Sequence, residues 1–469
     1  MPHGPQTAVG MLLANAMIGG RVGVSADSSF ALESKLRRYP PFVRFWLAST
    51  VSDFGTYITS VALSVLILVT MNGTALDQGL VNAARWAPYL LFGLVAGVWI
   101  DRLPRRTMLI GGDLGRGLIL AGVALASAAG LISVPVLMIL IFAFGTLALT
   151  SDAAYQSFLP QLVPRPLLTK ANARLQQSDT VAQTTGGAVA GGLVALVTAP
   201  FALLLDAVSY FLSASVLLTL ERPSQTPVRS KQRLHRKVAE GLRWVYRHPY
   251  LTPLACSTHI WFIGSSILGA VLPALILNDL GLGAVGLGLV MGCAGIGAVT
   301  GTTVSTRLGH RWGTGRTMVF ARAAQPVAIA LVALAPVVAG GTRTGESYGS
   351  PLQWTGAMWA AFALIGTGQL LFGAAMGVEG PVEMGFCQAV TPDGLLARMS
   401  ATMRSVNRGM IVVGAPLGGL IATMAGSGAA LWASVAFLLL ASVVLLCSRF
   451  RSVRTEDHQL PDDEALTRD

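Results

Sequence analysis

Long apolar runs separated by short polar segments dominate this chain. A membrane span needs roughly 20 mostly apolar residues to cross about 30 Å of hydrocarbon. Such runs predict twelve spans in two groups of six, at residues 43–69, 78–100, 107–129, 134–156, 175–197, 201–220, 254–277, 285–306, 317–339, 357–378, 405–425 and 429–448. The pattern therefore predicts an all-α membrane protein.

The polar segments divide the chain into five parts. We expect a disordered cytoplasmic tail, a six-helix half, a cytoplasmic linker, a second six-helix half and a cytoplasmic tail, at residues 1–41, 42–220, 221–250, 251–448 and 449–469. The apolar run 9–18 is too short to span. The first tail also lacks the basic start and the small-residue cleavage site of a secretory signal.

Composition agrees with a membrane protein. Of the 469 residues, 53% are hydrophobic and only 12% are charged, and the mean hydropathy is +0.62. Soluble domains carry about a quarter charged residues, so lipid must solvate much of this chain. The composition excludes a disordered chain, a coiled coil and a disulfide scaffold. The cysteines have no metal-ligand spacing, so we expect packing roles, and no metal or cofactor, for Cys256, Cys293, Cys387 and Cys447.

The positive charges predict the orientation. Lys and Arg concentrate in alternate segments, at 21–44, 102–106, 165–174, 222–247, 307–322 and 398–408. The opposite loops hold none, except for Arg343. Cytoplasmic loops of membrane proteins carry this excess, so we expect both termini in the cytoplasm of a bacterial inner membrane and count Arg322 among the cytoplasmic charges. The net charge of +11 then needs no nucleic-acid partner.

An internal repeat supports two related halves. Residues 158–168 (FLPQLVPRPLL) match residues 386–396 (FCQAVTPDGLL), and residues 187–193 (GAVAGGL) match residues 414–420 (GAPLGGL). Parallel repeats of six spans are typical of alternating-access secondary transporters. The linker between the halves predicts a basic amphipathic helix with Leu234, Val238, Leu242 and Val245 on its apolar face. We expect it on the inner leaflet, with a calmodulin-like partner site as the alternative.

The loop between predicted spans 2 and 3 carries a family signature. Its sequence, GVWIDRLPRR at 97–106, resembles the Gly-x-x-x-Asp-Arg-x-Gly-Arg-Arg loop of the major facilitator superfamily. The segments at 84–106, 113–116 (DLGR), 203–214 (LLLDAVSYFLSA) and 240–251 (EGLRWVYRHPYL) are similar to the branch of enterobactin exporters and macrolide efflux pumps. The resemblance runs from Phe42 to Ser448. It implies twelve helices in two pseudo-repeats and efflux by an antiporter, a function associated with multidrug resistance.

This chain departs from the family pattern in four places. Pro104 replaces the central Gly of the loop, and the corresponding loop at 307–316 has no acid. Span 4 lacks the Arg-x-x-x-Gly pattern of many proton-coupled members. Span 5 lacks the Pro of the antiporter motif, which span 11 has at Pro416.

The signature loop suggests a gate. Its acid can accept charge-assisted bonds, and its arginines can reach acidic groups or helix ends of the other half. We therefore predict a cytoplasmic latch formed by Gly97, Asp101, Arg102, Arg105 and Arg106. The alternative is a basic loop that only sets the topology.

Charged residues within the spans are candidates for proton coupling, since they are costly in lipid and usually functional or paired. The candidates are Asp53, Arg85, Asp113, Arg116 and Asp206. Asp53 is the first choice because it lies mid-span and desolvation favours its neutral form.

Several of these charged or polar groups have alternative roles. Asp53 could instead be paired permanently with Arg85 or a hydroxyl such as Thr56. Asp113 and Arg116, three residues apart on one helix, are expected to satisfy each other. His259 is expected to be a hydrogen-bonded packing residue. Asp152, Glu379 and Glu383 are placed near cytoplasmic span ends.

Small residues and aromatics complete the candidate set. Spans 5 and 11 carry close-packing positions at Gly187, Gly191, Gly192, Gly414, Pro416 and Gly418. Trp261 and Phe262 are substrate-cavity candidates, with lipid-facing positions as the alternative.

The chemistry in the sequence favours secondary transport over catalysis. No Gly-x-x-x-x-Gly-Lys-Ser/Thr loop is present, so the chain has no ATPase of its own, and no Ser/His/Asp or His-Glu-x-x-His cluster appears. We predict a monomeric, proton-coupled exporter of amphipathic small molecules such as a drug, an antibiotic or a siderophore-like natural product. The alternatives are a lipid or lysolipid permease and a non-transporting sensor or enzyme on the same fold.

Overall fold

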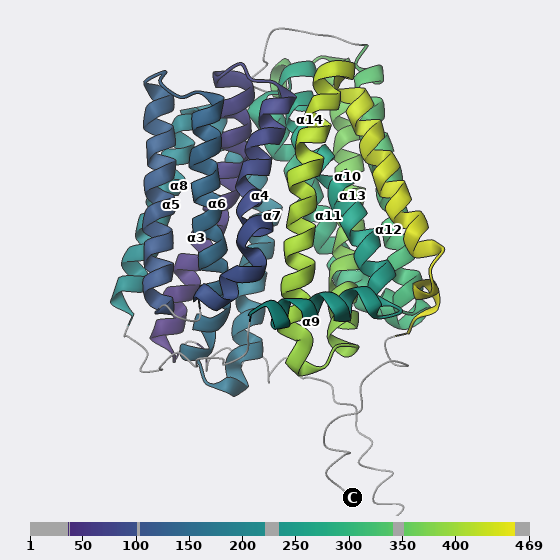
Figure 1. Ribbon diagram of the computed structural model, residues 1–469. Coiled ribbons are helices and arrows are strands. Elements are labelled where there is room, and N and C mark those ends of the chain that lie inside the picture. The colour runs from purple at the N-terminus through teal and green to yellow at the C-terminus, as the bar shows by residue number, and fades with distance from the viewer. Residues whose placement is uncertain (1–35, 37, 101–103, 221–233, 341–350, 455–469) are drawn as a thin grey trace, which may run out of the picture.

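The computed structural model describes residues 36, 38–100, 104–220, 234–340 and 351–454, and these residues form helices without strands. Long helices run side by side through the molecule (Figure 1). The first group comprises α3 (Pro40–Val65), α4 (Ala75–Ile100), α5 (Arg105–Ala128), α6 (Val134–Phe158), α7 (Leu168–Val197) and α8 (Ala199–Thr219). The second comprises α10 (Leu251–Ala274), α11 (Gly283–Trp312), α12 (Thr314–Val338), α13 (Gly356–Ala389) and α14 (Asp393–Leu446).

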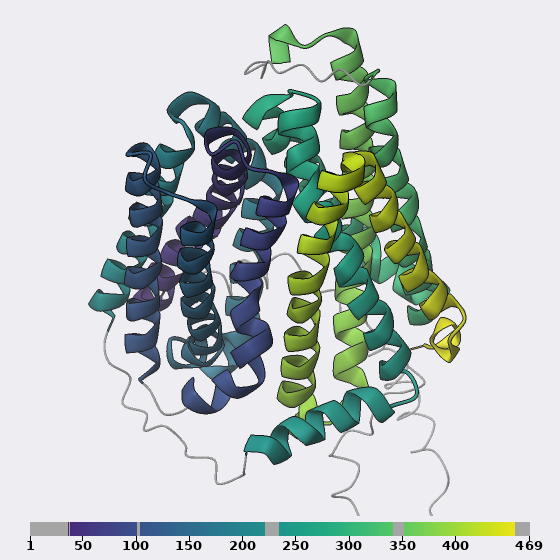
Figure 2. The same ribbon diagram turned by 45° about the horizontal axis from the view of Figure 1, so that its top comes forward.

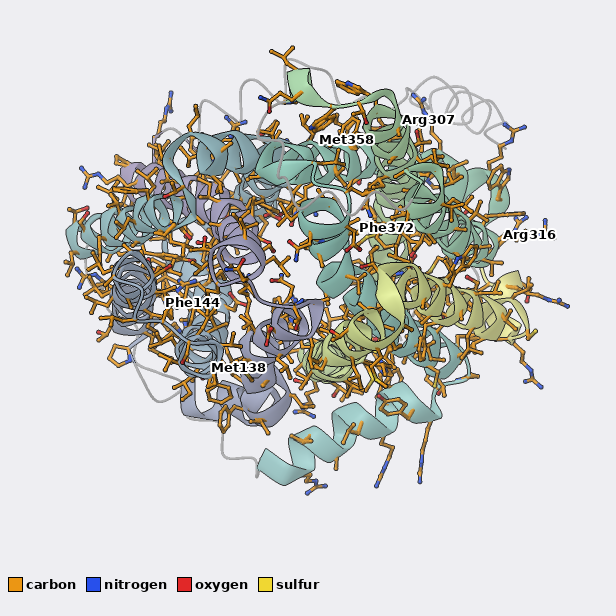
Figure 3. All side chains as sticks on the ribbon, turned by 90° about the horizontal axis from the view of Figure 1, so that it is seen from above. Met138, Phe144, Arg307, Arg316, Met358 and Phe372 are labelled. Carbon is orange, nitrogen blue, oxygen red and sulfur yellow. The ribbon has the colours of Figure 1, made fainter. Side chains whose placement is uncertain are left out.

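Ten of the described helices are long and apolar enough to cross a membrane. Seen from above, the helices carrying Met138 and Phe144 lie on one side of the molecule, and those carrying Met358 and Phe372 lie on the other (Figure 3). Apolar side chains from both groups join in one buried cluster that includes Leu66. The fold is therefore a multi-pass helical bundle with a shared apolar core.

The helix α9 (Leu234–Arg247) lies across one end of the bundle (Figures 1 and 2). Its Val245 is fully buried among side chains of the second group, and Trp244 Nε1 donates to Thr391 Oγ1 at 3.3 Å. An ion pair between Glu240 and Arg398 ties it to α14. The expectation that the apolar face of this helix lies on lipid is therefore wrong for Val245, which packs against protein.

Two helix junctions share an unusual backbone conformation. Thr198, between α7 and α8, has φ 73° and ψ 161°, and Gly426, within α14, has φ 88° and ψ 160°. They are 228 residues apart, the same offset that separates Phe158 from Phe386 in the sequence repeat. The non-helical backbone at Gly426 divides α14 into two arms. The ribbon of α14 turns back at the top of the bundle in Figure 1.

Exchanging these two residue types should change stability in opposite directions. Thr198→Gly should raise the melting temperature and Gly426→Thr should lower it, because a β-branched residue at positive φ costs about 1–3 kcal/mol. A Cβ at Gly426 would meet no atom within 4 Å, so the second change tests backbone conformation alone. Thermal unfolding of the purified variants in detergent provides the measurement. Unchanged melting temperatures would contradict the strain at this junction.

Candidate functional site

Cavities lined by charged and polar as well as apolar side chains interrupt the bundle in each group of helices. One cavity of about 370 Å³ lies among α3, α5, α6, α7 and α8, and we call it the first-half cavity. Another, of about 410 Å³, lies among α10, α12, α13 and α14, and we call it the second-half cavity. A third, of about 250 Å³, lies between the groups and includes Arg85 and Met291. Drug-sized ligands occupy pockets of roughly 300–1,000 Å³.

The first-half cavity contains a satisfied ion pair. Arg116 Nη2 lies 2.5 Å from Asp113 Oδ1, and Ser213 Oγ donates to Asp113 Oδ2 at 2.6 Å. The guanidinium also lies 4.5 Å from the centroid of the Tyr210 ring. The predicted pairing of Asp113 with Arg116 is therefore present, and the pair organises the wall of the cavity.

Asp53 lines the same cavity but, unlike Asp113, has no arginine paired with it among the described residues. Within the described residues, no ion pair or hydrogen bond to its carboxylate is found. Thr56 donates instead to the carbonyl of Ser52 at 3.1 Å. Arg85 lines the third cavity, and its guanidinium lies 5.6 and 5.8 Å from the ring centroids of Trp86 and Phe144. In this conformation, therefore, Asp53 is paired neither with Arg85 nor with the Thr56 hydroxyl.

Asp206 is buried in a different setting. Its side chain is 1% exposed, and it accepts hydrogen bonds from Thr59 and from Ser209, the latter at 2.8 Å. Two hydroxyl donors compensate part of the cost of burying a carboxylate. This arrangement favours a structural role for Asp206 over proton transfer.

The second-half cavity is built around a buried ion pair that sequence reasoning missed. Arg322, from α12, is 1% exposed and pairs with Glu379 of α13. Gln325 Nε2 donates to the same carboxylate at 2.7 Å. Counting Arg322 among the cytoplasmic charges was therefore wrong. Its position inside the apolar span 317–339 was the available signal, because charges within spans are usually paired.

Aromatic side chains form another wall of this cavity. Trp261 and Phe262, the two cavity candidates, both line it, with ring centroids 4.9 Å apart. Trp261 donates to Gln325 and lies against Phe372 at 6.4 Å between centroids. The cavity thus combines aromatic faces with carboxylates.

A cation–π contact joins the two groups of helices beside these cavities. The guanidinium of Arg408, on α14, lies 3.8 Å from the centroid of the Trp86 ring on α4. One turn further along α4, Tyr89 donates to Asp152 Oδ2 at 2.6 Å. Because Arg408 lines the second-half cavity and Asp152 the first-half cavity, this chain of contacts connects the two.

Only part of the predicted latch, Gly97, Arg105 and Arg106, lies within the described residues. Asp101 and Arg102 lie outside the described residues, Gly97 lies in α4 and Arg105 begins α5. Arg106 donates to the carbonyl oxygens of Leu217 and Leu218, at 3.0 and 2.7 Å, at the end of α8. The expectation that Arg106 reaches the other half is therefore wrong in this conformation, where its acceptors belong to its own half.

The glycine positions differ in what they contact. Cβ atoms at Gly187 and Gly191 would press on the backbone around Gly288 of α11, in the other group of helices. At Gly192, by contrast, a Cβ would meet nothing within 4 Å, so including it among the packing positions was wrong.

The packing positions on α14 have two kinds of neighbour. Gly414 and Gly418 face α10 in their own group, at Ile263 and Ile267. Gly79 of α4 approaches the backbone of Pro416 across the interface.

His259 has the packing role expected of it. Its ring nitrogens lie 2.7 Å from the Tyr246 hydroxyl and 2.7 Å from Asn407 Oδ1. It thereby ties α9, α10 and α14 together.

The fold and these cavities define a multi-pass membrane transporter. Membrane-length helices enclose polar cavities of ligand size, and the two groups of helices meet along an interface with close glycine contacts. Within the described residues, no three His, Cys, Asp or Glu side chains are grouped as metal ligands.

A family model described as transmembrane secretion effector matches residues 35–465, and the chain belongs to this family of major facilitator transporters. An uncharacterised MFS-type transporter of Sinorhizobium fredii is 25% identical over 87% of this chain and 95% of its own length. Macrolide efflux protein A of Streptococcus pyogenes is 30% identical over 32% of this chain and 36% of its own length. The predicted resemblance is confirmed, and the protein is a transporter rather than an enzyme.

Solved structures share the fold. A bacterial homologue of the iron transporter ferroportin, crystallised in an inward-facing state, superposes with a TM-score of 0.64 at 17% identity, covering 88% of this chain and 99% of its own. At this identity the likeness concerns the fold alone.

Proposed function

We propose that this chain is a proton-coupled secondary transporter that exports amphipathic small molecules across a bacterial inner membrane. The observation that carries the proposal is the pair of cavities with charged side chains in their walls, one in each group of helices, beside an interface with close backbone contacts. Such a construction suits alternating access, in which two halves rock around a central site. The efflux function in the name of the Streptococcus relative supports export, and we expect the chain to work as a monomer.

We further propose twelve spans in two pseudo-repeats. The helix α4, with 26 residues, and the second arm of α14 after Gly426 would add two spans to the ten apolar helices. The shared backbone conformation of Thr198 and Gly426 supports the repeat. So does the five-residue π-helix that follows the first helix of each half, at Leu66–Thr70 and Leu275–Asp279.

The proposed orientation has both termini in the cytoplasm. Exposed arginines gather at the bundle end that carries α9, among them Arg44, Arg307, Arg311 and Arg316. Figure 3 shows Arg307 and Arg316 at the rim of the second group. Positive charge favours the cytoplasmic side, and the first- and second-half cavities lie toward this end. The close contacts of Gly79 with Ala415 lie toward the opposite end. This arrangement supports an inward-open conformation.

Asp53 is the proposed proton carrier. Asp53→Asn should abolish pH-gradient-driven transport while leaving substrate binding intact, because asparagine mimics the neutral carboxyl and cannot release a proton. Asp77→Asn is the matched control, since Asp77 caps the start of α4 through Thr74 (2.7 Å to its backbone nitrogen) and asparagine can also cap. Efflux and binding are measured on the same purified variants in liposomes. Full gradient-driven transport by Asp53→Asn would exclude this carboxylate as the carrier.

A further inference from the structure

We propose that the second-half cavity binds the cationic group of an amphipathic substrate, with Glu383 as its counter-charge. This inference rests on the proposed function and specifies its substrate class as lipophilic monocations.

The charges at the floor of the cavity do not cancel. Arg322 and Glu379 form a buried pair, and Gln325 donates a second bond to Glu379. Glu383, one helical turn further along α13, lies 4.0 Å from Arg322 Nη2, beyond hydrogen-bond distance. Among the described residues, its hydrogen-bond donor is the Thr258 hydroxyl, at a long 3.4 Å. One negative charge is therefore left over when both carboxyl groups are ionised, and such a charge in a low-dielectric site is costly unless a cation compensates it.

The carboxylate of Glu383 is the member of this cluster that a ligand can reach. Its side chain is 22% exposed, against 1% for Arg322 and 9% for Glu379. Arg322 Nε and Nη1 are fully buried and have no acceptor among the described residues, and the guanidinium lies 5.6 Å from the Trp261 ring centroid. Arg322 thus stays within the wall, while Glu383 faces the cavity.

Two other arginines, Arg408 and Arg404, also line the cavity. Arg408 stacks on Trp86 and interacts electrostatically with Tyr89 and Asp152 of the first half. Arg404 is exposed. By contrast, the charged groups that act on Glu383 are Glu379 and Arg322. The negative charge of Glu383 is therefore local to the part of the cavity bounded by α10, α12 and α13.

The remaining walls suit a bulky apolar cation. Phe262 presents aromatic surface beside Trp261, whose ring already contacts Arg322 and Phe372. Cations are attracted to ring faces within about 6 Å. Thioether side chains, which adapt to varied ligand shapes, come from Met376, Met384, Met399 and Met403. A site with one carboxylate, aromatic faces and methionines matches a lipophilic cation better than a polyanion.

The test uses two probes of the same shape and opposite charge. Binding of tetraphenylphosphonium and tetraphenylborate to the wild-type protein in phosphatidylcholine nanodiscs is measured by calorimetry, with empty nanodiscs subtracted. We expect the cation to bind, and Glu383→Gln to weaken it by about tenfold or more, because pairing with a desolvated carboxylate is lost. Glu383→Asp should retain part of the affinity. Asp77→Asn should bind the cation as the wild type does.

Several outcomes would overturn the proposal. Tighter binding of tetraphenylborate by the wild-type protein would assign the cavity to anions through its arginines. Equal affinity of the wild type and Glu383→Gln for the cation would remove the counter-charge role. The wild-type comparison remains decisive even if the variant fails to fold. Absence of pH-gradient-driven transport in the wild type, with cation binding intact, would reject the proposed function but not this site.

Discussion

Gly191→Ala should slow transport roughly tenfold, whereas the adjacent change Gly192→Ala should leave the rate close to that of the wild type. At Gly191 an added Cβ would lie 2.5 Å from the Ala284 carbonyl oxygen and 2.9 Å from the Gly288 Cα, both on α11. Backbone cannot give way as a flexible side chain can, so α7 and α11 would have to separate.

The size of this effect follows from the conformational equilibrium. A change of about 1.4 kcal/mol alters a population ratio tenfold, and inserting an extra methyl group into a well-packed contact costs about 1–3 kcal/mol. The rates are measured on both variants in liposomes at equal protein content. Gly192→Ala is a matched control, because it adds the same methyl group one residue away where nothing lies within 4 Å. Equal rates for both variants would contradict the role of this contact in the transport cycle.

Arg322→Met should prevent stable folding, and the double variant Arg322→Met/Glu379→Leu should recover much of the lost stability. Removing one partner of a buried ion pair costs about 3–5 kcal/mol because it leaves an uncompensated charge, whereas replacing both with apolar residues is often neutral. Arg322 is 1% exposed and pairs with Glu379, so the single change leaves Glu379 and Glu383 without their cation.

Yield of monodisperse protein and melting temperature in detergent provide the measurements. The single variant Glu379→Gln is the comparison for the loss of the other partner, and it keeps an acceptor for Arg322. A folded, wild-type-like Arg322→Met would contradict the buried pair. So would a double variant no more stable than the single one.

The helices could be located from the sequence, because apolar periodicity and length determine them locally. The predicted span 201–220 coincides with α8 at Ala199–Thr219, and the predicted span 134–156 with α6 at Val134–Phe158. The family follows from short motifs in fixed order, which do not depend on packing. The division into domains at residues 221 and 251 stays a prediction.

Tertiary pairing was harder to predict. Arg322 and Glu379 are 57 residues apart, and neither sequence position shows that the other is its partner. Their contact depends on how α12 and α13 pack and rotate, which hydropathy does not report. The same limit explains Gly191 and Gly192, since a run of small residues does not show which of two adjacent positions faces α11. For Arg106 we predicted a helix end of the other half as the acceptor. The acceptor is indeed a helix end, but it belongs to α8 in the same half.

Substrate-driven proton movement in sealed liposomes tests the central proposal most directly. With a pH-sensitive dye inside and the wild-type protein in the membrane, adding tetraphenylphosphonium should start a proton flux opposite to the cation, and an imposed pH gradient should drive cation accumulation. Cation accumulation that continues unchanged when the pH gradient is dissipated at constant membrane potential, with no accompanying proton flux, would contradict proton-coupled transport.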